Sequence, residues 1–222
     1  MTRTSAVPRG VSATFWRLVT SERLGRATVL DVGTGRGRIA LALAPLARRV
    51  IGVDRDGEAI AEATRQAQAS NLVNVEFVVA DAEKIELGGL VPGERPALIT
   101  AHLYFADALV ERAGHALGPG GALAAVAFHV DQWQETGRRS RFAYDEAQAR
   151  TLLASHGFHV EHLEIEREVQ RFASVEEALA AAVGLEERWR ADGRWFNYLR
   201  FLEEGGRTLT RSHLVLKARR AG

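Results

Sequence analysis

Residues 29–40 decide the fold, and they read Val29-Leu30-Asp31-Val32-Gly33-Thr34-Gly35-Arg36-Gly37-Arg38-Ile39-Ala40. The first four form an apolar run around one carboxylate, which predicts a buried parallel strand. Three glycines at alternate positions follow, and glycine permits positive φ and a close approach of a ligand to the backbone. The next segment favours a helix that begins with unpaired N–H groups. The stretch predicts a nucleotide-sized cleft at a strand end, and a turn that only packs a strand against a helix is the alternative.

Two later apolar runs also end in a carboxylate. Residues 49–54 end at Asp54, and residues 75–82 contain Asp81. In a doubly wound fold, an acidic residue at the tip of the second strand accepts hydrogen bonds from ribose hydroxyls. A single carboxylate at a strand end is usually just solvated. Three of them on successive strands, with a glycine loop after the first, point to one adenosine site.

The pattern D-x-G-x-G-x-G over residues 31–37 resembles motif I of the class I S-adenosylmethionine-dependent methyltransferases. The dinucleotide fingerprint G-x-G-x-x-G has glycine where this chain has Arg38, so a nicotinamide-dependent oxidoreductase is disfavoured. The resemblance covers residues 27–164 and 207–218, and it implies S-adenosylmethionine as the cofactor.

The resemblance also implies a set of cofactor-binding residues. It places Asp31 near the methionine moiety, Asp54 on the ribose and Asp81 on the adenine amine, and a backbone carbonyl near Thr100 on the amino group. The implied cofactor-binding residues are Asp31, Gly33, Thr34, Gly35, Gly37, Asp54, Arg55, Asp81, Ala82 and Thr100. Arg36 and Arg38, in and after the glycine loop, are placed to meet a carboxylate.

Alternating strands and helices over the rest of the chain predict an α/β fold with both sheet faces covered. Further strands are expected at 97–101, 122–128, 159–164 and 208–217, and helices at 107–117 and 145–155. We expect a doubly wound, mainly parallel sheet of seven strands with an antiparallel last strand, in one domain over residues 1–222.

Two regions fall outside this alternation. Residues 10–24 read as an amphipathic helix, which either forms a lid over the cofactor or docks on the sheet through Trp16. Residues 172–206 read as a helical insertion, with a capping box that starts at Ser174 and a second helix over 185–202. Its aromatic residues indicate core packing, a cap over the substrate or a dimer interface.

The loop after the fourth predicted strand supplies the candidate catalytic residues, His102 and Tyr104. An imidazole has an unperturbed pKa of roughly 6.5, which suits a general base, although His102 could instead only form hydrogen bonds. Tyr104 could orient an acceptor, stack on it or simply pack. His129 and Trp133 are weaker candidates. The loop lacks the N/D-P-P-Y/F motif of enzymes that methylate nucleobase amines.

The charge and residue composition of the chain limit the kinds of partner and site that we expect. The net charge is +1, which gives no whole-molecule reason to expect nucleic-acid binding. The chain has no cysteine, so a thiolate nucleophile is excluded, and the H-x-E pairs on residues 159–164 do not predict a metal. The basic cluster at residues 137–141 reads as a solvated loop or a contact for an anionic substrate.

These features predict a methyltransferase that acts on a small-molecule acceptor. The alternatives are an RNA or protein methyltransferase of the same fold and a non-catalytic S-adenosylmethionine-binding protein. We expect no membrane-spanning segment and, because residues 1–10 lack an apolar signal core, a cytoplasmic location. A homodimer would follow if the insertion were an interface.

Overall fold

The computed structural model describes residues 6–140 and 142–222. The expectation about a signal core therefore falls partly outside the described residues, as does Arg141 of the basic cluster. The chain divides into two compact units. Unit 1 comprises the described residues up to Ala127, with Glu146–Glu164 and Val215–Gly222, and unit 2 comprises Phe128–Asp145 and Ile165–Leu214.

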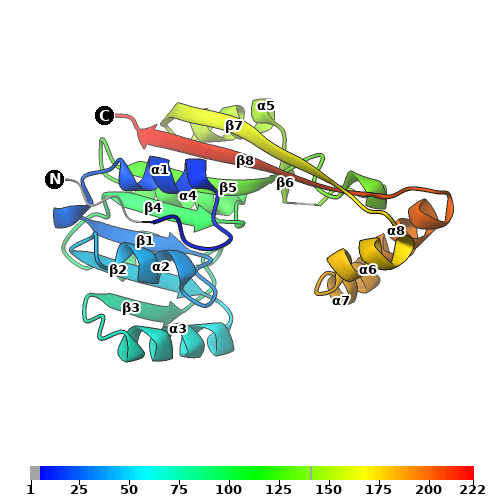
Figure 1. Cartoon of the computed structure of the whole chain (residues 1–222). Helices are drawn as coiled ribbons and strands as arrows, with labels where there is room; N and C mark the ends of the chain where they lie inside the picture. The colour runs from blue at the N-terminus through cyan, green and yellow to red at the C-terminus, as the bar shows by residue number, and fades with distance from the viewer. Residues whose placement is uncertain (1–5, 141) are drawn as a thin grey trace. The chain divides into compact units, whose positions relative to one another are not determined.

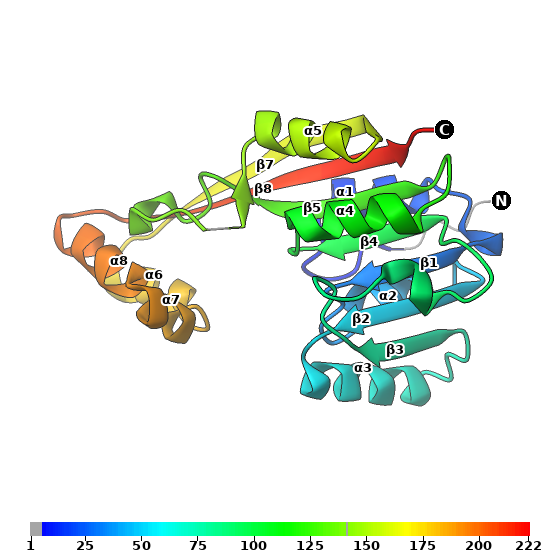
Figure 2. The ribbon, with the colours of Figure 1, turned by 180° about the vertical axis from the view of Figure 1, so that it is seen from behind.

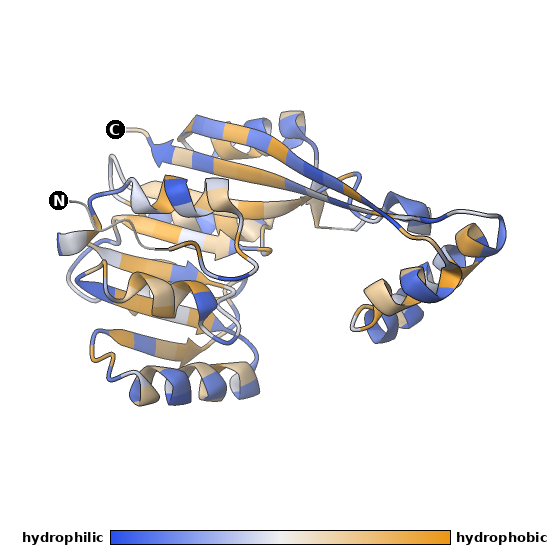
Figure 3. Cartoon of the chain, in the orientation of Figure 1, coloured by the Kyte–Doolittle hydropathy of each residue, from blue (hydrophilic) through white to orange (hydrophobic). Residues whose placement is uncertain are grey.

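The strands lie close to the predicted positions (Figure 1). They are β1 (Thr28–Val32), β2 (Arg49–Asp54), β3 (Val75–Val79), β4 (Leu98–His102), β5 (Ala122–His129), β6 (Ala143–Tyr144), β7 (Phe158–Arg171) and β8 (Thr208–Arg220). β3 ends before Ala80, so the prediction of a strand to residue 82 was wrong and Asp81 lies in the following turn. β7 is much longer than the predicted 159–164, because hydrophilic and hydrophobic residues keep alternating along it (Figure 3).

The sheet order is β3-β2-β1-β4-β5-β8-β7, with the two-residue β6 beside β5 as an eighth strand. β1 pairs in parallel with β2 and β4, and Asp31 lies opposite Gly52 on one side and Thr100 on the other. The Arg220 N–H donates to the Gly121 carbonyl at 2.8 Å. The end of β8 therefore lies beside the start of β5, and the last strand is antiparallel, as predicted.

Helices cover both faces of the sheet in unit 1. In Figure 1 α1 and α2 lie in front of the strands, and Figure 2 shows α4 and α5 on the opposite face. The α-helices of unit 1 are α1 (Ala13–Thr20), α2 (Arg38–Leu43), α3 (Gly57–Ala69), α4 (Asp107–Ala116) and α5 (Glu146–Ser155). No helix of the described residues is long and apolar enough to cross a bilayer.

α1 docks on the sheet through its apolar side. Phe15, Trp16 and Val19 are at most 2% exposed and belong to the same core cluster as Val29 of β1 and Val126 of β5. Ser12 caps the helix by accepting a hydrogen bond from the Phe15 N–H at 3.0 Å. The structure therefore favours the docked helix over a lid for this segment.

The insertion in unit 2 forms helices α6 (Val175–Ala182), α7 (Glu186–Asp192) and α8 (Arg194–Glu203). The single helix predicted over 185–202 was wrong, because Gly193 adopts φ 84° and separates α7 from α8. The capping box forms in part: Ser174 accepts from the Glu177 N–H, but the Glu177 carboxylate accepts from the Ala173 N–H instead of from Ser174.

The aromatic residues of unit 2 pack on one another. Trp189 is fully buried, with ring centroids 5.3 Å from Trp133 and 5.6 Å from Tyr198, both in edge contact. Trp195 and Leu202 complete this aromatic core. The surplus of aromatic residues is therefore explained within unit 2, and it requires neither a substrate cap nor a dimer interface.

Candidate functional site

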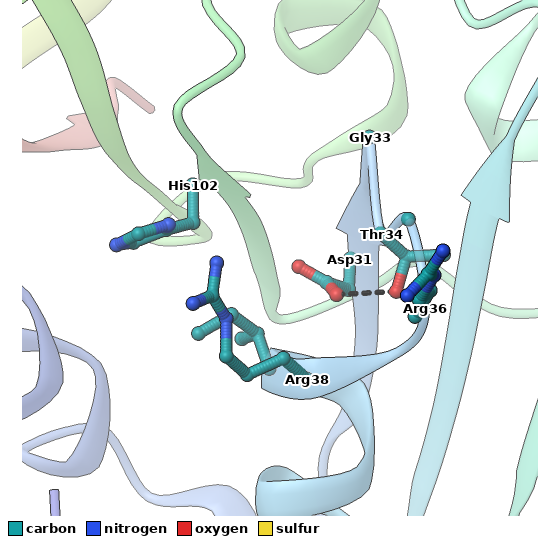
Figure 4. A pocket seen from close by; sticks show the side chains of 8 residues that line it. Asp31, Gly33, Thr34, Arg36, Arg38 and His102 are labelled. Carbon is teal, nitrogen blue, oxygen red and sulfur yellow. Dashed lines mark hydrogen bonds between the residues drawn. The ribbon is translucent and has the colours of Figure 1, made fainter. Parts of the chain in front are cut away.

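A cavity of about 380 Å³ lies in unit 1, where β1 and β4 end (Figure 4). It gathers five of the predicted site residues. Asp31 lies in β1, residues 33–35 lie in the loop after β1, and His102 ends β4, which is adjacent to β1 in the sheet but far from it in the chain. The lining residues are Asp31, Gly33, Thr34, Gly35, Arg36, Arg38, Ile39 and His102.

Asp31 is the buried carboxylate of the site, with 1% of its surface exposed. One carboxylate oxygen accepts from the Thr34 hydroxyl at 2.6 Å, and the other accepts from the Thr100 hydroxyl at 2.8 Å. Burial raises the pKa of Asp31 to about 6, against the lowering effect of these two hydroxyls. Because a positive charge nearby stabilises a carboxylate, this acid is suited to a cationic ligand.

Thr100 is fully buried and lies beneath the cavity without lining it. Its hydroxyl fixes Asp31 from the neighbouring strand. The structure thus shows that the Thr100 side chain holds Asp31, while the predicted contact of its backbone carbonyl with the cofactor stays a prediction.

The glycine loop adopts positive φ at Gly33, Gly35 and Gly37. A Cβ at Gly37 would lie 2.8 Å from the Phe77 ring, and a Cβ at Gly33 would lie 2.9 Å from Tyr104 Cβ. These two glycines are needed for packing inside the protein. A Cβ at Gly35 would meet nothing within 4 Å, so the loop leaves open space at this position.

Asp54, at the end of β2, is joined to the glycine loop. Its Oδ2 accepts from the Gly35 N–H at 2.8 Å, and its Oδ1 accepts from the Asp56 N–H at 3.0 Å. Each oxygen has a second lone pair, so the carboxylate keeps its capacity to accept from a ligand hydroxyl. It does not line the cavity itself.

Asp81, Ala82, Arg55 and Tyr104 are also outside the lining of the cavity. Asp81 accepts from the Glu83 N–H at 3.1 Å and pairs with Lys84 at 3.2 Å, and these contacts lower its pKa. Burial, followed by the Glu83 and Asp81 carboxylates, raises the pKa of Tyr104 to about 12. Tyr104 is therefore a neutral hydroxyl at physiological pH, which suits orientation of a ligand better than proton removal.

His102, the last residue of β4, lines the cavity. Its ring lies 5.4 Å from the Phe15 ring in an edge contact, so α1 helps to position it. The following residue, Leu103, has φ 62° and is 38% exposed. A bulky residue with positive φ marks local backbone strain next to the candidate base.

Three residues line the cavity that were not among the predicted cofactor-binding or catalytic residues: Arg36, Arg38 and Ile39. The sequence does indicate the two arginines, because they are charged residues in and after a glycine loop, where we expect them to meet a carboxylate. Ile39 is one apolar residue of a buried helix, and nothing in the sequence distinguishes it from other core positions.

The weaker candidates lie in unit 2. His129 is 6% exposed, with Nδ1 2.9 Å from the Ser212 hydroxyl, and Trp133 lies in the aromatic core. Both side chains are buried by partners within unit 2, and neither is among the residues that line the cavity of unit 1. In the basic cluster, Arg138 donates to the Asp192 carbonyl.

Comparisons with known proteins agree with this geometry. Residues 29–121 match the family model described as a methyltransferase domain. The YcgJ protein of Bacillus subtilis has the same fold, with a TM-score of 0.71 and 16% identity, covering 93% of this chain and 97% of that one. Magnesium protoporphyrin IX methyltransferase of Synechocystis PCC 6803, solved with bound S-adenosylhomocysteine, gives a TM-score of 0.60 and 17% identity over 94% and 80% of the two chains.

A curated relative in sequence is the tRNA (uracil-5-)-methyltransferase homolog A of Mus musculus, which is 46% identical over 69 residues. The match spans 31% of this chain and only 10% of the mouse protein. The family match over residues 29–121 and the shared fold support a class I S-adenosylmethionine-dependent methyltransferase.

Proposed function

We propose that the protein transfers a methyl group from S-adenosylmethionine to a small-molecule acceptor. The observation that carries this proposal is the cavity at the ends of β1 and β4, which has the buried Asp31 carboxylate in its wall and is joined to Asp54 through Gly35. A methyl-donor site needs groups that bind adenosine and a group that faces a positively charged sulfur, and Asp54 and Asp31 are the candidates for these two roles.

The residues present fit the cofactor. Asp54 has free lone pairs for ribose hydroxyls, and the open space at Gly35 lets a ligand approach the backbone. Asp31 is held by Thr34 and Thr100 with its charge in the cavity wall. Its charged form, which burial disfavours, would be stabilised by a cationic group of the cofactor.

S-adenosylmethionine supplies a methyl group on a positively charged sulfur, which is already a good leaving group. The remaining task of the protein is to hold the acceptor in line with that methyl group, and positioning alone lowers the barrier substantially. His102 is the candidate base for an acceptor that is protonated at neutral pH, and Tyr104 is the candidate group for orienting it.

Charge supports a small acceptor. The chain carries 29 basic and 28 acidic residues, whereas proteins that bind nucleic acid usually carry a marked positive excess. The competing candidate is an RNA methyltransferase, because curated relatives in sequence carry such names. The absence of cysteine from this chain excludes methylation of a pyrimidine carbon through a thiolate.

The first test is isothermal titration calorimetry with S-adenosylmethionine, S-adenosylhomocysteine and NAD. We expect both adenosyl ligands to bind and NAD to give no signal, and the reverse preference would overturn the proposal. Incubation with radiolabelled S-adenosylmethionine and either a metabolite pool or purified RNA then separates the acceptor classes. Binding without methylation of either pool would support the non-catalytic alternative.

The role of His102 is tested once an acceptor is known. Replacing His102 with alanine should slow turnover without changing the affinity for S-adenosylhomocysteine. Wild-type rates at all pH values would remove His102 as the base.

A further inference from the structure

Three arginines of unit 2 meet at one acidic residue, Asp192, which ends α7. Arg194 pairs with its carboxylate, and Nη2 lies 3.1 Å from Oδ2. Arg138 donates through Nη1 to the Asp192 backbone carbonyl. Arg188 lies four residues before Asp192 in α7, and side chains at this spacing are neighbours on one side of a helix. We call these four residues the Asp192 cluster.

The Asp192 cluster carries more positive than negative charge. Arg138 and Arg188 are exposed, and neither pairs with a carboxylate in residues 6–140 and 142–222. Glu186 of α7 does not compensate them, because it pairs with Arg190 at 2.7 Å. Successive residues of a helix are turned by about 100°, so this second pair lies on the side of α7 opposite to Arg188. Two of the three positive charges in the cluster therefore remain uncompensated.

Arg194 is the buried member of the cluster, with 8% of its surface exposed. Its guanidinium lies over the Trp133 ring, 5.7 Å from the ring centroid. Its Nε is buried and has no acceptor among the described residues, whereas buried donors in proteins are nearly always paired. Burial lowers the pKa of Arg194, and the Asp192 carboxylate raises it. The charges of Arg138 and Arg188 lower this pKa again, so the guanidinium lies where negative charge is lacking.

The backbone adds further donors at the same place. α8 begins at Arg194 and follows Gly193, which has no side chain that could cap the helix. Asp192 Oδ1 accepts from the Arg194 N–H at 3.2 Å. The next N–H groups of the first turn have no partner within the helix, and such helix starts favour anions. Side-chain and backbone donors thus lie together beside Asp192.

We propose that the Asp192 cluster binds the phosphate group of a phosphorylated small molecule. A phosphate monoester carries about 1.5 to 2 negative charges at neutral pH, which matches the two uncompensated positive charges. The planar fork of a guanidinium also binds phosphate oxygens in pairs. A carboxylate carries only one charge and matches the cluster less well. All four residues belong to unit 2, so this site goes beyond the proposed function and does not depend on it.

The test follows inorganic phosphate and ribose 5-phosphate by phosphorus NMR during titration with the protein, in chloride at constant ionic strength. We expect saturable line broadening of both probes by the wild type. The double variant Arg138→Gln/Arg188→Gln should weaken the binding of both probes by at least roughly 5-fold, the scale of losing charge-assisted hydrogen bonds at a partly exposed site. Both side chains are exposed, so this variant should fold as the wild type does, which far-UV circular dichroism checks.

The matched control is the double variant Arg200→Gln/Arg211→Gln, which removes the same charge from exposed positions of unit 2. Arg200 lies in the last turn of α8 and Arg211 lies in β8, and neither belongs to the Asp192 cluster. This control should bind both probes as the wild type does. An equal loss in the two double variants would indicate general attraction by positive charge and would overturn the inference.

Two further outcomes would also overturn it. One is the absence of saturable broadening with the wild-type protein. The other is displacement of phosphate by an equal concentration of acetate, because a carboxylate would then fit the cluster as well as phosphate does. Calorimetry with S-adenosylhomocysteine is a separate measurement, so failure of the phosphate site and failure of the proposed function can be told apart.

Discussion

The two units bury their apolar side chains in different ways. The core of unit 1 consists mainly of aliphatic and alanine side chains on a sheet that helices cover on both faces. The core of unit 2 is aromatic and contains three of the four tryptophans of the chain. In unit 1 the polar residues Asp31, Thr34 and His102 line a cavity at the strand ends, whereas the large rings of unit 2 pack against one another.

Backbone strain shows the same difference. Trp133 in unit 2 and Leu103 in unit 1 both have positive φ. Trp133 is 7% exposed, and its ring contacts Trp189 and Arg194, so packing offsets the strain. Leu103 is 38% exposed and has much less packing to offset it. Packing of a large buried ring thus accompanies positive φ in unit 2, whereas in unit 1 the positive φ of Leu103 follows the cavity-lining His102.

The largest expected effect comes from Trp189→Ala, which removes the centre of the aromatic core. Loss of a fully buried tryptophan should cost about 3–5 kcal/mol, measured by urea unfolding with near-UV circular dichroism. If the units are energetically distinct, S-adenosylhomocysteine should bind as before. Phe196→Ala is the control, because Phe196 is 58% exposed and its loss should change stability by less than about 0.5 kcal/mol. A parallel loss of ligand binding would contradict the separation of the units.

Asp54→Ala tests the ligand-binding edge of unit 1. Loss of the acceptor for ribose hydroxyls should weaken S-adenosylhomocysteine binding by about 1–3 kcal/mol in calorimetry. Asp56→Ala is the matched control, since the Asp56 side chain caps α3 by accepting from the Glu58 and Ala59 N–H groups. That variant should lose stability but keep its affinity. Equal affinity losses in the two variants would show that the loop, and not the Asp54 carboxylate, matters.

Asp31→Asn tests the charge buried in unit 1. The folded protein raises the pKa of Asp31 to about 6, so its contribution to stability is present at low pH and is lost as the pH rises through 6. The free energy of unfolding of Asp31→Asn, relative to that of the wild type, should therefore increase by about 1–2 kcal/mol between pH 5 and pH 8. Urea unfolding at the two pH values measures this difference. If the variant and the wild type differ in unfolding free energy by the same amount at both pH values, burial does not destabilise the charged form of Asp31.

The smallest effect is expected at Leu103. Leu103→Gly removes the strain of positive φ but adds backbone entropy to the unfolded chain, so stability should rise by at most about 1 kcal/mol. Leu103→Ala keeps the strain and should give no gain. Thermal unfolding of both variants measures the contrast. If Leu103→Gly and Leu103→Ala lower the stability of the protein equally, the positive φ at residue 103 carries no strain.

Most of unit 1 could be predicted from the sequence. Buried parallel strands are continuous apolar runs, and the glycine loop and the strand-end carboxylates are local patterns that need no knowledge of distant residues. The boundaries of β1 and β2 and the joining of Asp31, Asp54 and the loop follow from these patterns. The end of β3 and the break at Gly193 were missed, since one turn or one glycine within a helical pattern gives little signal.

The sequence by itself determined the doubly wound sheet, its glycine loop and the carboxylates at its strand ends, because periodicity and glycine placement act over a few neighbouring residues. Only the tertiary structure decided what the side chains contact. It brought His102 and Arg38 to one cavity, and it packed the tryptophans of unit 2 against one another. The reason is physical: local patterns determine whether a side chain is buried, but its contacts depend on segments that are distant in the chain.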